Sequence, residues 1–149
     1  MRIFGSVVAG YATMFLVVFL GLSLVWVVLG ADGAFQPGTF SVSTTWILLS
    51  IVVGFLAAMA GGWVSRRIAI TDAGPKALAL VVVVLGVLLA IPTFGADATE
   101  AAVRTGTLPM FDAISAARTP AWVALLNPVL GAVGVMIGGR KGHARSLSG

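Results

Sequence analysis

Long apolar stretches that contain no charged residue occur four times along the chain. They cover residues 3–29, 45–64, 77–94 and 121–137. About 20 apolar residues are enough for an α-helix to cross the roughly 30 Å hydrocarbon core of a bilayer. The pattern therefore predicts four membrane-spanning helices. The third and fourth stretches are short and would need a few flanking residues, whereas the first is long enough to tilt or to project beyond the membrane.

A cleaved signal peptide is an alternative interpretation of the first stretch. Arg2 precedes the stretch, and Ala31 offers a small residue for a cleavage site. The apolar region of a signal peptide has only about 7 to 15 residues, however, and this stretch is about twice as long. We therefore interpret it as a membrane anchor.

The composition of the chain also indicates a membrane protein. Hydrophobic residues make up 59% of the 149 positions and charged residues 9%. Soluble domains contain about 25% charged residues, so this chain lacks the polar groups needed to cover a water-exposed surface. Cysteine is absent, which excludes disulfides and thiolate metal sites.

Basic residues lie mainly on one side of the predicted membrane. Arg2 and the topology-determining residues fall on that side, whereas Arg104 and Arg118 fall on the other; the topology-determining residues are Arg66, Arg67, Lys76, Arg140, Lys141 and Arg145. Cytoplasmic loops are enriched in Lys and Arg. We therefore expect an all-α, up-down-up-down four-helix bundle over residues 1–149 with both termini in the cytoplasm, an outer loop at 95–120 and a basic cytoplasmic tail at 138–149.

This orientation predicts a multi-pass protein of a bacterial cytoplasmic membrane whose basic residues contact anionic lipid headgroups. The net charge of +4 is not interpreted as a sign of nucleic-acid binding. The basic residues flank apolar stretches, and no aromatic residues alternate with them to form a stacking platform.

Small residues recur at helical spacing in the second and fourth stretches. The candidate helix-packing residues are Gly54, Ala58, Gly62, Gly131, Gly134 and Gly138. Small residues three or four apart lie on one helical face and allow two helix backbones to approach closely in lipid. Both stretches end in paired glycines and basic residues. A duplication of a two-helix hairpin would explain this likeness, and so would independent selection for a tightly packed helix with a basic end.

The polar side chains inside the stretches are the candidates for a functional site, because no charged residue lies there. We single out Tyr11, Ser23, Ser50 and Asn127. Pro128 follows Asn127 and removes an amide donor from the helix, which leaves a backbone carbonyl free one turn earlier. A hydrogen bond between helices is the alternative role for Asn127.

No arrangement of residues indicates catalysis or a cofactor. The single histidine, His143, lies in the basic tail without a neighbouring carboxylate. The acids predicted on the outer side match no established metal-ligand spacing; they are Asp32, Asp97, Glu100 and Asp112. We therefore expect neither an enzyme nor a bound metal or cofactor.

Three short motifs carry a resemblance in layout to small four-helix membrane proteins of bacteria. They are GGWVSRR at 61–67, TPAW at 119–122 and GGRKGHAR at 138–145. The resemblance implies a four-helix membrane bundle and no particular activity. We expect a protein that acts through helix packing, in a homo-oligomer or with another membrane protein. The alternative is a small oligomeric transporter or channel lined by the polar residues singled out above.

Overall fold

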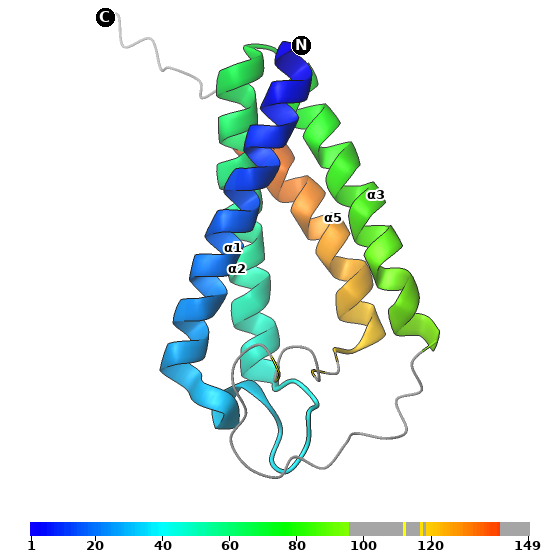
Figure 1. The fold of residues 1–149 in the computed structure, drawn as a ribbon. Coiled ribbons are helices and arrows are strands. Elements are labelled where there is room, and N and C mark those ends of the chain that lie inside the picture. Colours follow the sequence, from blue (N-terminus) through cyan, green and yellow to red (C-terminus); the bar gives the residue numbers. More distant parts are fainter. Residues whose placement is uncertain (96–111, 113–116, 118, 141–149) are drawn as a thin grey trace, which may run out of the picture.

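Four long helices make up the computed structural model, which describes residues 1–95, 112, 117 and 119–140. They are α1 (Arg2–Ala34), α2 (Thr44–Ala69), α3 (Ala73–Gly95) and α5 (Ala121–Gly138). Consecutive helices run in opposite directions (Figure 1). Each is long and apolar enough to cross a membrane. The prediction of an all-helical chain with four such helices is confirmed. The predicted loop at 95–120 and tail at 138–149 lie mostly outside the described residues.

The helices extend beyond the apolar stretches that predicted them. α1 continues four residues past Gly30, where φ is 63° and ψ is −175°. Glycine adopts this positive φ without steric cost, so the helix bends there, next to its predicted end at residue 29. α2 begins after Ser43, whose hydroxyl accepts a 3.1 Å hydrogen bond from the amide of Trp46. This N-cap satisfies an amide that has no partner within the helix.

The turn between α2 and α3 is short and held by polar contacts. The amide of Ile70 donates to the carbonyl of Arg66 over 3.0 Å, and the Arg66 guanidinium forms an ion pair with Asp72. Ile70 itself has φ 64°. A β-branched residue rarely occupies this left-handed region, so the turn stores backbone strain at this position.

We expect Ile70→Gly to raise the free energy of unfolding by about 1 kcal/mol, because glycine removes this strain. Little packing is lost, since the Ile70 side chain is 66% exposed. Thermal unfolding in detergent measures the change. Ile68→Gly is the matched control: Ile68 lies inside α2, where glycine should lower stability by a similar amount. A loss of stability in both variants would contradict the assignment of strain to Ile70.

The helices form two pairs that converge at one end. α1 packs on α2 and α3 packs on α5, and α2 and α5 cross between the pairs. The pairs approach each other at the end that holds the N-terminus and spread apart toward the other end (Figure 1). A buried cluster of Ala58, Leu78, Ala79 and Val135 fills the converging end.

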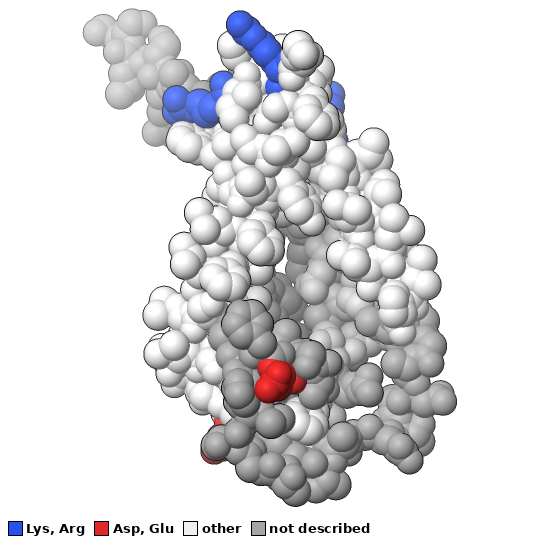
Figure 2. Space-filling model, viewed as in Figure 1, with Lys and Arg blue, Asp and Glu red and all other residues white. Residues whose placement is uncertain are grey.

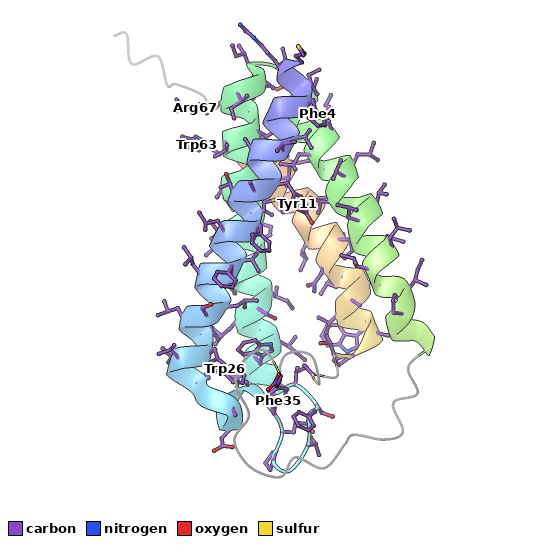
Figure 3. The ribbon with its side chains drawn as sticks, in the orientation of Figure 1. Phe4, Tyr11, Trp26, Phe35, Trp63 and Arg67 are labelled. Atoms are coloured by element: carbon purple, nitrogen blue, oxygen red, sulfur yellow. The ribbon has the colours of Figure 1, made fainter. Side chains whose placement is uncertain are left out.

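A second buried cluster closes the spread end. It joins the end of α1, the α1–α2 loop and the start of α5, and consists of Ala34, Phe35, Phe40, Val42, Ile47 and Val123. Trp26 and Phe35 lie together at this end (Figure 3), with ring centroids 6.2 Å apart and planes at 76°. Aromatic pairs favour this edge-to-face geometry.

Basic residues gather at one of the two ends, where Asp72 pairs with Arg66. All described Lys and Arg residues lie at the converging end, which we call the basic end; they are Arg2, Arg66, Arg67, Lys76 and Arg140. Asp32 and Asp112 lie at the opposite end, which we call the loop end because the α1–α2 loop is there. Figure 2 shows blue basic groups at the top and red acidic groups below, with uncharged residues between them.

Candidate functional site

Small residues bring α2 and α5 into backbone contact. A Cβ atom added at Gly62 would collide with the carbonyl of Val135, and one added at Gly138 would collide with the carbonyl of Met59. A Cβ at Gly134 would lie 2.7 Å from that of Ala58. Such distances leave no room for a methyl group. Four of the six predicted helix-packing residues therefore meet in this one contact.

The other two predicted packing residues lie elsewhere. A Cβ at Gly131 would lie 2.8 Å from Cγ1 of Val82, so this glycine packs against α3. A Cβ at Gly54 would meet no described atom within 4 Å. Among the described residues Gly54 therefore makes no close contact with another helix, and its role in helix packing stays a prediction.

A second close contact, which was not predicted from the sequence, lies between α1 and α2. A Cβ at Gly10 would lie 2.9 Å from the carbonyl of Gly61, and one at Gly61 would lie 2.7 Å from the carbonyl of Gly10. The Ser65 side chain is fully buried beside Gly10, and its hydroxyl has no hydrogen-bond partner among the described residues. Gly61 belongs to the paired glycine at 61–62, and this pairing could have indicated contacts on two sides of α2.

A cavity of about 440 Å³ lies where the two helix pairs separate. Residues from three helices and the segment before α5 line it. They are Tyr11 and Met14 of α1, Ala124, Asn127 and Pro128 of α5, Thr119, and Val82, Leu85, Gly86, Leu89 and Ala90 of α3. Figure 2 shows the molecule hollowed between the pairs. The volume falls in the range of about 300–1,000 Å³ that is typical of small-molecule sites.

Two of the four predicted polar residues line this cavity. Tyr11 lies on the side of α1 that is turned toward α3 and α5 (Figure 3), and Asn127 lines the cavity from α5. Neither side chain has a hydrogen-bond partner among the described residues. Pro128 also deprives the carbonyl of Ala124, another lining residue, of its usual helical donor. The cavity thus contains uncharged donors and acceptors within an apolar wall.

The other two predicted polar residues do not line the cavity. The Ser50 hydroxyl donates a 2.8 Å hydrogen bond to the carbonyl of Ile47 in its own helix. Serine hydroxyls often satisfy themselves in this way inside helices. Ser23 lies on α1 three turns beyond Tyr11, outside the lining. These two residues therefore do not form one polar site with Tyr11 and Asn127.

The predicted topology-determining residues that the structure describes all lie at the basic end. Arg66 is paired with Asp72, and the guanidinium of Arg67 lies 4.8 Å from the ring centroid of Trp63. Lys76 and Arg140 are exposed at the same end. Lys141 and Arg145 lie outside the described residues.

No family model, curated protein or solved structure matches the chain.

Proposed function

We propose that this protein is a multi-pass integral membrane protein of the cytoplasmic membrane, with its basic end in the cytoplasm. The exposed surface between the two ends supports insertion, because large side chains such as Leu24, Val28 and Leu88 are more than half exposed on it. Exposing this apolar surface to water would cost free energy, whereas contact with lipid chains would not. The gathering of Lys and Arg at one end supports the orientation.

Single cysteines introduced into this cysteine-free chain test the orientation. We expect a membrane-impermeant maleimide to label Gln36→Cys at the loop end in intact cells, and Thr71→Cys at the basic end only after permeabilisation. Both native side chains are exposed. Leu24→Cys, on the apolar surface, is the control and should stay unlabelled in both conditions. Labelling of both ends in intact cells, or labelling in the reverse order, would overturn the proposed topology.

The proposed role is non-catalytic binding of a bilayer-dissolved molecule in the cavity between α1, α3 and α5. The cavity is the observation that carries this proposal. Its wall is mostly apolar, it is open between the helix pairs, and its Tyr11 and Asn127 side chains have no hydrogen-bond partner among the described residues. Concave, mainly apolar sites with a few polar groups are typical of small-molecule binding.

Association with a second copy or with another membrane protein would use surfaces other than Gly62 and Gly138, because contacts within the chain occupy these two glycines. Tyr11 and Asn127 line one cavity within a single chain. This favours a second candidate function, a small transporter that would not require an oligomer to form its site. Flux of a small uncharged solute into proteoliposomes that falls in Asn127→Leu would support this candidate.

A photoreactive hydrocarbon tests the binding role directly. In lipid nanodiscs, we expect a diazirine-bearing alkane to label cavity residues such as Leu89 to saturation. Labelling of the apolar surface at Val28 should instead increase in proportion to the concentration of the probe. Leu85→Trp should block the cavity labelling, whereas Leu80→Trp, exposed but outside the lining, should not. Equal, non-saturating labelling of both regions would overturn the binding proposal.

A further inference from the structure

The polar groups of the cavity define what it can bind. Tyr11 lies nine residues, about 14 Å along α1, from Arg2, and Asn127 lies six residues, about 9 Å, into α5. In the proposed topology both side chains therefore reach the hydrocarbon region. A polar group without a partner is costly there. A bound molecule that pairs with these side chains removes this cost.

The hydrogen-bonding capacity of the two side chains limits which polar group of a ligand can bind beside them. The Asn127 amide offers two donors and one acceptor, and the Tyr11 hydroxyl offers one donor and accepts as well. The Ala124 carbonyl adds a further acceptor on the same helix as Asn127. A hydroxyl group can donate to or accept from either side chain, and a carbonyl group can accept from either. A hydrocarbon would leave all of them unpaired.

The absence of charge from the lining limits the partner further. Every lining residue is uncharged. A carboxylate or ammonium group in this cavity would be taken out of water with no opposite charge beside it, which binding cannot compensate. The wall that faces the polar groups is made by the apolar side chains of α3, with Val82, Leu85 and Leu89 spaced three and four residues apart on one face. This wall suits a hydrocarbon chain or ring.

We propose that the cavity binds a neutral amphiphile, whose apolar part lies against α3 and whose hydroxyl or carbonyl group hydrogen-bonds to Asn127 or to Tyr11. This inference rests on the proposed binding role and names its ligand class. The cavity is open between the helix pairs, so a molecule dissolved in the bilayer can enter it directly (Figure 2).

Three photoreactive probes of equal chain length test the ligand class: a diazirine-bearing long-chain alcohol, the corresponding fatty acid and the corresponding alkane. The full chain is labelled in nanodiscs, and the labelled residues are mapped by mass spectrometry. We expect half-saturation of the cavity at the lowest concentration for the alcohol. At least one of the variants Asn127→Leu and Tyr11→Phe should raise that concentration by about 3- to 10-fold, as expected for one lost hydrogen bond. The same variants should leave the alkane unaffected.

Ser50→Ala is the matched control, because it removes a hydroxyl that lies outside the cavity and bonds to its own helix. It should leave labelling by all three probes unchanged. Thermal unfolding checks that Asn127→Leu and Tyr11→Phe fold, and both exchange an unpaired polar group for a less polar one of similar size. Saturable labelling that is equal for alcohol and alkane, and unchanged in both variants, would overturn the ligand class but keep the binding role. Preference for the fatty acid would also overturn it. Failure of every probe to saturate would overturn the binding role itself.

Discussion

Gly138→Ala is expected to lower the free energy of unfolding by roughly 2–3 kcal/mol, although alanine is the better helix former. The added methyl group would collide with the carbonyl of Met59 on α2. A backbone atom cannot move aside by changing a rotamer, so the two helices must separate. Gly62→Ala should have an effect of similar size, because its methyl group would collide with the carbonyl of Val135 on α5. Unfolding by a denaturing detergent in mixed micelles measures both changes.

Gly54→Ala is the matched control for these variants. Gly54 lies in α2 eight residues before Gly62, and an added Cβ would meet no described atom within 4 Å. Alanine there should raise stability by up to about 1 kcal/mol through helix propensity alone. The sign of the change thus separates the crossing point from the open part of the helix. Loss of stability in Gly54→Ala, or none in Gly138→Ala, would contradict the α2–α5 contact.

The helices were predictable because their signal is local. Charge-free apolar length is a property of each stretch, and all four stretches are helical. The ends were less predictable. α2 runs through Arg66 and Arg67 to Ala69, since charged side chains extend from a helix as readily as from a loop. The turn residue Ile70 has a side chain that gives no sign of positive φ.

The candidate site was only partly predictable, since spacing identifies a helical face but not its partner. Gly54 shares the four-residue spacing of Ala58 and Gly62, yet an added Cβ there would meet no described atom within 4 Å, whereas one at Gly62 would collide with α5. Tyr11 and Asn127 were predicted as polar positions inside the membrane. That both line one cavity depends on how α1 and α5 are placed relative to each other. The part of the cavity wall that α3 forms could not be predicted, because its lining residues resemble the apolar residues around them in the sequence. Which residues contact another helix or line the cavity depends on how the helices pack against one another.

Phe35→Ala is expected to destabilise the loop end by about 3–4 kcal/mol, the usual effect of removing a buried aromatic side chain. Phe35 is 4% exposed. Its ring packs edge-on against Trp26 and, at 5.8 Å between centroids, against Phe40. Its position is fixed by a bridge to Val42 in the α1–α2 loop. Hydrogen exchange measures the change, and amide protection in residues 35–47 should fall by about two to three orders of magnitude.

The control for this variant is Gln36→Ala, which shortens an exposed neighbouring side chain and should leave exchange unchanged. The effect of Phe35→Ala should also reach the start of α5, because Val123 belongs to the same buried cluster. It should not reach the crossing at Gly62 and Gly138, which has its own cluster at the basic end. Two clusters that have no residue in common can open independently. A uniform fall in protection along α2 and α5 would show instead that both ends unfold as one unit.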